Sequence, residues 1–175
     1  MTDSRNILTR AEALVRASET RDPDVIARDL GVRVYDNLEA PSLLGMYCCR
    51  WRTRFVLLNS RLDSRTRRIV LAHELGHDQQ HRALARAGGL QEFSLFNMRS
   101  RTEYEANAFA AHLLLDTEEF LACVREGWDT VQTASRLDTN INLVLIKAAE
   151  LNHLGWDLRM PEEPDSCFLK KTDPN

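Results

Sequence analysis

The sequence predicts an α+β protein in which one small sheet lies among helices. Two observations support this fold class: strand-forming residues concentrate within 32–59, and apolar residues recur at helical spacing before and after that stretch. The chain has 175 residues, of which 43% are hydrophobic and 28% charged, so it is long enough and apolar enough to bury a core. This composition excludes a disordered chain, a collagen-like repeat and a low-complexity scaffold.

Two helices are expected before the sheet. Residues 7–18 repeat apolar side chains at helical spacing. Asp22 followed by Pro23 is typical of an N-cap and a first helical turn, and Gly31 stands where a left-handed C-terminal stop belongs. We therefore expect a second, short helix between Asp22 and Gly31.

Three β-rich segments follow the two helices. They are separated by Pro41 and by a polar turn around Arg52, and they span residues 32–35, 43–49 and 54–59. The simplest assembly of three such segments is a small antiparallel sheet.

The rest of the chain is predicted to be helical. A long helix is expected from Asp63 or Ser64, either of which is a good N-cap, to about residue 85, followed by a loop over 86–100. Further helices are expected at 101–115, 117–125, 130–137 and 143–154. The last two are joined by a short turn in a helix-turn-helix-like arrangement, and the tail after Trp156 is expected to be extended or frayed. We group these elements into a domain over 1–125 and a helical extension over 126–175 packed on it.

Charge and hydropathy narrow the classes of partner. The chain has 23 Lys and Arg against 26 Asp and Glu, a formal net charge of −3, which argues against nucleic acid or an anionic membrane as a direct partner. No stretch reaches the roughly 20 apolar residues that a membrane span needs, and the first residues form no apolar signal-peptide core, so a cytoplasmic location is expected. One group of arginines is interpreted as a solvated hairpin tip and helix start, with binding of phosphates or an acidic partner as the alternative: Arg50, Arg52, Arg54, Arg61, Arg65, Arg67 and Arg68.

The four cysteines are interpreted as reduced thiols. Cys48, Cys49, Cys123 and Cys167 form neither a CxxC pair nor a regular disulfide spacing. Adjacent Cys48 and Cys49 would point to opposite faces of a strand. A cysteine zinc site is not expected, because such sites usually take two ligands from one short turn.

The motif with the clearest chemistry is HExxH, which occupies His73 to His77 in the long predicted helix. Residues four apart on a helix lie on one face about 6 Å apart, so both imidazoles can bind one Zn²⁺ at roughly 2.0–2.1 Å. Zinc lowers the pKa of a bound water toward about 7, and Glu74 is placed to act as the general base. The apolar run 69–72 indicates a buried helix, which seldom turns ionisable groups inward without a functional reason.

A catalytic zinc site normally has a third protein ligand and an open position. His81 continues the four-residue spacing, but eight residues of helix separate it from His73 by about 12 Å along the axis, so one ion cannot take both unless the helix breaks. In the next predicted helix Glu103 and Asn107 share a face, which makes Glu103 the predicted third ligand and Asn107 a hydrogen-bond partner of a ligand histidine. Glu105 is the alternative third ligand if that helix is rotated.

These residues together resemble a known family. The block AHELGHDQQH, followed about 20 residues later by EYEANAFAAHLLL and preceded by the strand entry DLGVRVYD, resembles the ImmA/IrrE family of zinc metallo-endopeptidases over roughly residues 26–120. The resemblance implies a zincin-like fold, an intracellular protease and a substrate that is often a helix-turn-helix repressor of a mobile element or stress response. The family usually has Met and Pro after the paired leucines where this chain has Leu115 and Asp116, a departure that concerns the local turn.

The resemblance also implies a role for the sheet. In zincin-like enzymes an edge strand above the active helix pairs with an extended peptide substrate, and residues 44–49 or 54–59 would form that strand. Stabilising the oxyanion requires a further hydrogen-bond donor. The candidates are Tyr47, Tyr104, His112 and His153.

The leading hypothesis is a cytoplasmic zinc endopeptidase. In it, zinc is bound by His73, His77 and Glu103, Glu74 is the general base, and Asn107 supports the ligands. The expected substrate is a co-encoded helix-turn-helix repressor. The alternative is a non-catalytic zincin-like regulatory protein that binds a repressor or DNA. The helix at 143–154 contains Lys147 as its only basic residue, which is a poor composition for reading bases. A purely structural zinc ion would need a fourth ligand, from His81 or Glu105.

Overall fold

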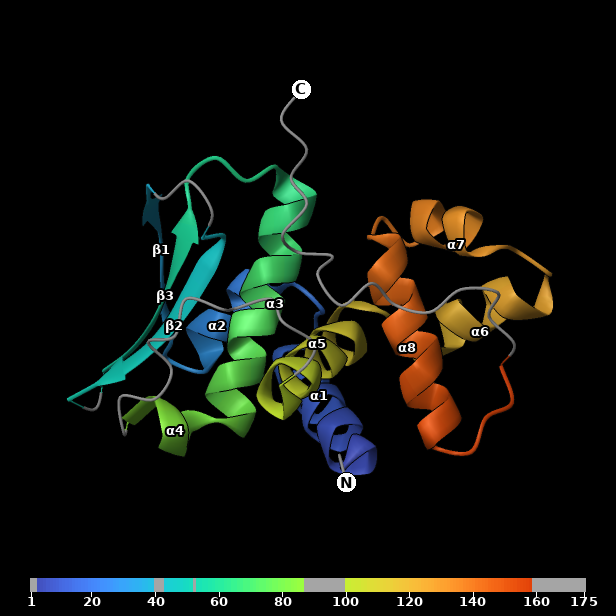
Figure 1. Ribbon diagram of the computed structural model, residues 1–175, viewed down its shortest axis with the longest axis horizontal. Helices are drawn as coiled ribbons and strands as arrows, with labels where there is room; N and C mark the ends of the chain where they lie inside the picture. Colours follow the sequence, from blue (N-terminus) through green and yellow to red (C-terminus); the bar gives the residue numbers. More distant parts are fainter. Residues whose placement is uncertain (1–2, 40–42, 52, 87–99, 159–175) are drawn as a thin grey trace.

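Helices surround a small sheet in the computed structural model of the chain, which describes residues 3–39, 43–51, 53–86 and 100–158 (Figure 1). The predicted α+β class is confirmed. The elements are α1 (Ser4–Ser18), α2 (Pro23–Asp29), β1 (Arg33–Leu38), β2 (Gly45–Arg50), β3 (Thr53–Asn59), α3 (Ser64–Gln80), α4 (Arg82–Arg86), α5 (Arg101–Leu114), α6 (Thr117–Arg125), α7 (Thr130–Arg136) and α8 (Ile141–His153).

The helix starts lie where capping residues predict them. The Asp63 side chain accepts a hydrogen bond from the Thr66 N–H at 2.9 Å at the start of α3, and Asp22 caps α2. The predicted continuous helix to about residue 85 is wrong, because α3 ends at Gln80. His81 leaves the helical conformation (φ −123°, ψ 18°) and α4 begins at the next residue.

The sheet has the order β1-β3-β2, and only one of its two pairings is antiparallel. β2 pairs antiparallel with β3, whereas β1 pairs parallel with β3, so the sheet is mixed and the prediction of an antiparallel sheet is wrong for β1. The reason is the order of the strands in the sheet. When three successive strands alternate in direction, the first and the third run parallel, and here β1 and β3 are neighbours. β2 is therefore an edge strand.

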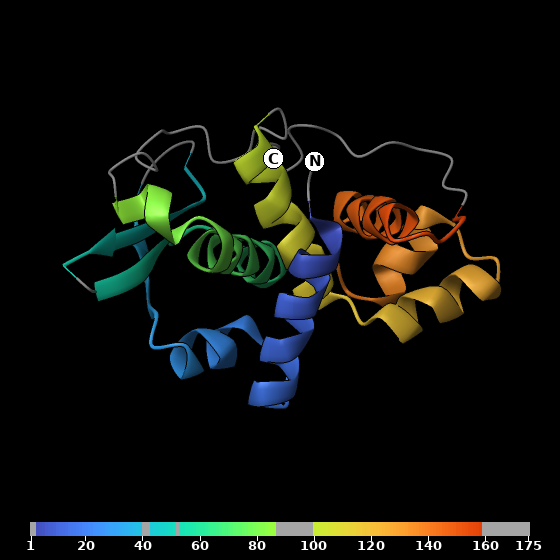
Figure 2. The same cartoon turned by 90° about the horizontal axis from the view of Figure 1, so that it is seen from below.

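The elements follow one another across the molecule in layers. In both Figure 1 and Figure 2, α3 lies between the sheet and α5, and α6, α7 and α8 lie on the far side of α5. One buried apolar cluster joins the sheet, α1, α3 and α5, and a second joins α6, α7 and α8. α8 contributes to both clusters, with Ile146 in the first and Val144 in the second. The division at residues 125 and 126 stays a prediction.

Several of the clustered arginines form ion pairs. Arg67 contacts Asp24 and Asp36, both at distances under 3 Å, and Arg65 contacts Asp138 at 2.6 Å. These contacts support the interpretation of the basic segment as a structural and solvated surface; Arg52 lies outside the described residues.

The other general predictions concern cysteines and membranes. Cys48, Cys49 and Cys123 are free thiols, with Cys49 more buried than Cys48 as expected for opposite strand faces, and Cys167 lies outside the described residues. Within the described ranges, no helix combines the length and apolarity that a bilayer crossing requires.

Candidate metal centre

The site forms where α3 and α5 cross. A Cβ atom built on Gly76 would lie 2.9 Å from the Cα and the carbonyl oxygen of Ala106, closer than real Cβ contacts. Gly76 therefore lets the backbones of the two helices approach more closely than any side chain would permit. This close approach places Glu103 and Asn107 of α5 beside the histidines of α3.

Three of the predicted residues converge within the protein interior. His73 Nε2 lies 3.1 Å from His77 Nε2, 3.3 Å from one Glu103 carboxylate oxygen, and the other Glu103 oxygen lies 3.5 Å from His77 Nε2. All three side chains are buried. In the described part of the chain, they are the one group of His, Cys, Asp or Glu found with ligand atoms this close, all within 4.8 Å. We refer to these three residues as the metal centre.

The geometry of the metal centre fits a zinc ion. Three ligand atoms about 2.0–2.1 Å from a tetrahedral ion lie about 3.3–3.4 Å from one another. The measured separations of 3.1, 3.3 and 3.5 Å agree with that figure to within a few tenths of an ångström. Two imidazoles and one carboxylate are also a ligand set that zinc hydrolases use.

Electrostatics prepare these side chains to bind a cation. Burial lowers the pKa of His77 to about 4, which leaves its imidazole neutral with a lone pair available. Burial by itself would raise the pKa of Glu103, but hydrogen bonds and charge interactions with His73 and His77 lower it to about 2. Burial likewise opposes a charge on His73, and the carboxylates of Glu103 and Glu74 outweigh it and raise its pKa. A metal ion would displace that proton.

The two outward ring nitrogens are held by different partners. His73 Nδ1 lies 2.7 Å from Asn107 Oδ1, the contact expected from the shared face of Asn107 and Glu103. His77 Nδ1 lies 3.1 Å from His81 Nδ1. Glu105, the alternative third ligand, lies away from the histidine pair and contacts His81 at 3.0 Å. The structure thus brings Glu103, and not Glu105, to the metal centre.

Glu74 is fully buried beside the metal centre and faces the edge strand. Neither of its carboxylate oxygens has a hydrogen-bond partner of normal geometry among the described residues. Burial raises the pKa of Glu74 to about 8, against the opposing influence of His73. A Cβ atom on Gly45 of β2 would lie 3.0 Å from Glu74 Oε1 and 2.5 Å from Val70 Cγ1, so glycine lets β2 approach the carboxylate.

Sequence reasoning missed Asp78, the residue after the motif. Its carboxylate is fully buried and accepts hydrogen bonds from Tyr47 OH at 2.7 Å, Arg54 Nη1 at 2.8 Å and Arg82 Nη2 at 2.9 Å. Tyr47 lies on β2 and Arg54 on β3, and Arg54 also donates to the Leu30 carbonyl oxygen. Asp78 therefore fixes the sheet to the end of α3, and an acid within a buried helix was the available signal.

The four candidates for oxyanion stabilisation have other contacts. Tyr47 donates to Asp78, and Tyr104 donates to Glu150 at 2.6 Å. His112 lies 3.2 Å from Lys147 Nζ, and His153 lies 3.3 Å from Glu150. None of these contacts involves the metal centre. They therefore do not assign oxyanion stabilisation to any of the four residues.

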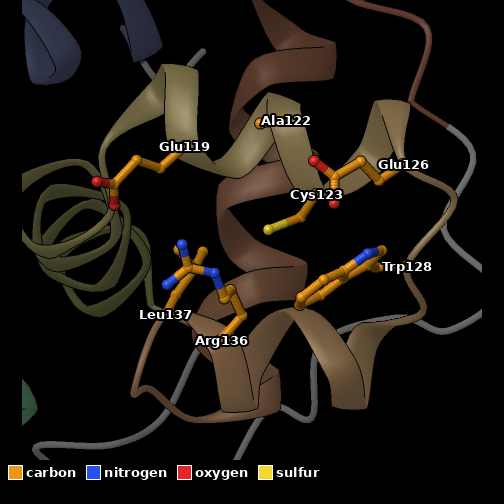
Figure 3. A pocket seen from close by; sticks show the side chains of 7 residues that line it. All are labelled: Glu119, Ala122, Cys123, Glu126, Trp128, Arg136 and Leu137. Atoms are coloured by element: carbon orange, nitrogen blue, oxygen red, sulfur yellow. The ribbon is translucent and has the colours of Figure 1, made fainter.

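A separate pocket of about 110 Å³ lies between α6 and α7 (Figure 3). The Cys123 thiol points into it, and Trp128 and Arg136 border it. Its lining residues include no member of the metal centre. It is therefore a local hollow between α6 and α7 rather than part of the α3–α5 site.

The family to which the chain is matched is a family of metallopeptidases. Residues 19–147 match the family described as the IrrE N-terminal-like domain, peptidase M78, and the chain belongs to that family. The match confirms the family resemblance and extends beyond residue 120 through α6, α7 and about half of α8. The chain is also similar to "Uncharacterized immunity region protein 2" of Bacillus phage phi105, with 31% identity over 109 residues that cover 62% of this chain and 68% of the relative.

Proposed function

We propose that this protein is a zinc-dependent endopeptidase that hydrolyses peptide bonds of a helix-turn-helix repressor. The observation that carries the proposal is the convergence of His73, His77 and Glu103 at tetrahedral spacing next to the buried carboxylate of Glu74. Membership of the peptidase M78 family supports the same reaction class.

The metal centre would hold zinc through the Nε2 atoms of His73 and His77 and the carboxylate of Glu103. A zinc ion there supplies Lewis-acid chemistry, which polarises the substrate carbonyl and lowers the pKa of water. In its ionised form, which a cation in the metal centre would favour, Glu74 takes a proton from the attacking water as the water oxygen bonds to the carbonyl carbon. When the carbon–nitrogen bond breaks, Glu74 returns the proton to the leaving amine. Asn107 keeps the His73 ring oriented through Nδ1.

β2 is the proposed peptide-binding strand, because one of its edges pairs with no other strand among the described residues. Of the two strands considered from the sequence, β3 is central and β2 lies at the edge, with Gly45 against Glu74. An extended peptide can add to such an edge by backbone hydrogen bonds, which bind without demanding a particular side chain. Asp78 holds β2 in place through Tyr47. This arrangement supports an endopeptidase that acts on an extended segment of a protein.

The substrate class rests on the relative and on the family resemblance. The relative from phage phi105 is named an immunity region protein, and the resemblance implies repressors of mobile elements as substrates. We infer a helix-turn-helix repressor encoded beside this chain, which makes the protein a regulator of transcription through proteolysis. A cytoplasmic location remains a prediction.

The test compares wild type with Glu74→Gln on the repressor encoded by the neighbouring reading frame. Both proteins are loaded with zinc, and cleavage is followed by gel electrophoresis and mass spectrometry. We expect Glu74→Gln to lower the cleavage rate by about 10²–10⁴-fold while zinc binding persists, because this residue moves protons and does not bind the ion. Glu118→Gln, at an exposed glutamate of α6, is the matched control and should cleave like wild type.

The proposal would be contradicted if the repressor stayed equally intact with wild type and with Glu74→Gln. If the repressor or DNA then bound the protein without being cut, and did so after zinc removal, the non-catalytic regulatory alternative would replace it. A salt-dependent affinity would identify DNA as the partner.

A further inference from the structure

The break between α3 and α4 turns His81 back onto the metal centre. The His81 N–H still donates to the His77 carbonyl oxygen at 2.9 Å, but the residue has left the helical conformation. Its ring lies beside the His77 ring, with centroids 5.2 Å apart and planes inclined at 56°. His81 is 5% exposed, so its imidazole is surrounded by protein groups and not by water.

A continuous series of contacts runs outward from His77 through three further side chains. His77 Nδ1 lies 3.1 Å from His81 Nδ1, and His81 Nε2 lies 3.0 Å from Glu105 Oε2. Arg101 Nε donates to the other oxygen, Glu105 Oε1, at 2.6 Å. We name His81, Glu105 and Arg101 the outer chain.

One assignment of protons satisfies each of these contacts. If His77 binds a metal ion through Nε2, its Nδ1 carries the ring proton and donates to His81 Nδ1. His81 then has its proton on Nε2, which faces the Glu105 carboxylate, an acceptor at both oxygens. The Arg101 guanidinium donates to the remaining Glu105 oxygen. The order of donors and acceptors therefore agrees along the whole outer chain.

We infer that the outer chain positions His77 for the metal, with His81 as the direct partner and Glu105 acting through it. This inference deepens the proposed function, because it rests on the proposed metal site. Glu105 then has a defined role although it is not a ligand. It supplies the negative charge that orients His81, and Arg101 fixes that carboxylate at the surface end.

The same geometry argues against His81 or Glu105 as a fourth ligand. His81 contacts the Nδ1 side of His77, whereas His77 Nε2 faces His73 and Glu103. Each polar ring atom of His81 already faces a partner of the outer chain. A purely structural zinc ion with four protein ligands would require His81 or Glu105 to leave this arrangement.

The first experiment measures zinc affinity by competition with a chromogenic chelator. We expect Glu105→Gln and His81→Leu each to weaken zinc binding by about 10–100-fold, the usual cost of losing an outer partner of a ligand. Arg101→Gln should have a smaller effect, because Arg101 is 64% exposed and acts at the far end. Glu118→Gln removes a similar Glu–Arg contact on α6 and should stay within about twofold of wild type.

A double variant tests whether Glu105 acts through His81. The combination His81→Leu/Glu105→Gln should bind zinc no more weakly than His81→Leu alone, since a residue that acts through another adds nothing once that partner is gone. Additive losses would overturn the inferred order. If Glu105→Gln does not fold, judged by circular dichroism, His81→Leu and Arg101→Gln give the same comparison.

The second experiment reads the positions of the ring protons directly. Two-bond nitrogen–proton correlation spectra of the zinc-loaded protein should show the His77 proton on Nδ1 and the His81 proton on Nε2. A His81 proton on Nδ1, or zinc affinity within twofold of wild type in the Glu105 and His81 variants, would overturn the inference. Neither experiment needs a substrate. If the protein gives both expected results but cuts no repressor, the proposed function is refuted and the inference on the outer chain stands.

Discussion

Two buried clusters of histidine and glutamate lie on opposite sides of α5, and they differ in one respect. In the metal centre, the converging atoms are imidazole nitrogens and carboxylate oxygens, all of which carry lone pairs. In the second, which we call the lysine cluster, the ammonium of Lys147 lies 3.2 Å from His112 Nδ1, and Glu150 lies 3.6 Å from His112 Nε2. Lys147 is fully buried and also donates to Thr117 at 3.0 Å.

The comparison shows that burial of ionisable groups does not by itself identify a metal site. The lysine cluster includes its own nitrogen donor, Lys147 Nζ on α8, which faces His112 on α5, so the cluster joins α8 to α5. The metal centre assembles only groups that attract a cation. A metal site is thus identified by the charge of the converging groups and by the direction in which their ligand atoms point. Both are properties of the folded protein.

The largest expected effect separates the two clusters by zinc binding. His77→Ala removes a proposed ligand, so it should weaken zinc binding by more than the roughly 100-fold upper cost of an outer-partner change. Lys147→Met alters the lysine cluster and should leave zinc affinity within about twofold of wild type. Isothermal titration with zinc measures both. A large loss of affinity in Lys147→Met would show that the two clusters are not independent.

The next effect concerns the crossing that assembles the metal centre. Replacing a mid-helix glycine by alanine normally stabilises a helix by about 1 kcal/mol. At Gly76 we expect the opposite sign, a loss of about 1–3 kcal/mol in urea unfolding, because the added Cβ would overlap Ala106. Zinc affinity should fall with it, since α5 and Glu103 must move outward. A stabilised variant with unchanged affinity would show that the crossing tolerates a side chain.

A third expected effect is a pH dependence that belongs to the lysine cluster. Burial lowers the pKa of Lys147 to about 7, so between about pH 7 and 10 the unfolded chain holds a proton that the folded chain has released. The free energy of unfolding should therefore rise with pH through this window, by at most about 1.4 kcal/mol per pH unit. Four charged groups act on Lys147: Glu12, Arg21, Asp116 and Glu150.

Denaturant unfolding of wild type and Lys147→Met between pH 7 and 10 measures this contribution as a difference. Burial also lowers the pKa of His112, which is thus neutral throughout the window and does not obscure the comparison. Parallel curves for the two proteins would mean that Lys147 has an ordinary pKa in the folded state.

Local signals in the sequence predicted most elements of the fold. Capping residues such as Asp22 and Asp63 predicted helix starts, because a cap acts on the N–H groups of its own first turn. The parallel pairing of β1 with β3 and the end of α3 at Gln80 were not predicted. Both depend on contacts between distant segments, such as the contact of His81 with Glu105 on α5.

The site likewise contains residues that helical spacing predicted and residues whose contacts depend on the tertiary structure. Helical spacing predicted that His73 and His77 share a face, and that Glu103 and Asn107 do so on another helix. Those expectations correspond to what the structure brings together, while the roles of these residues stay proposals. The part played by Asp78 and the contact of His81 with His77 depend on how α3 ends and how β2 lies against it.

Local periodicity predicted the α+β class, helical spacing predicted which residues could face a metal ion, and the residues around HELGH and EYEAN carried the family resemblance. The packing of α5 on α3 then sets which glutamate faces the histidines: Glu103 does, while Glu105 contacts His81. The physical reason is the close crossing at Gly76 and Ala106, which sets the rotation of α5 relative to α3. A helix has the same periodicity at every rotation, and packing against its neighbour selects one.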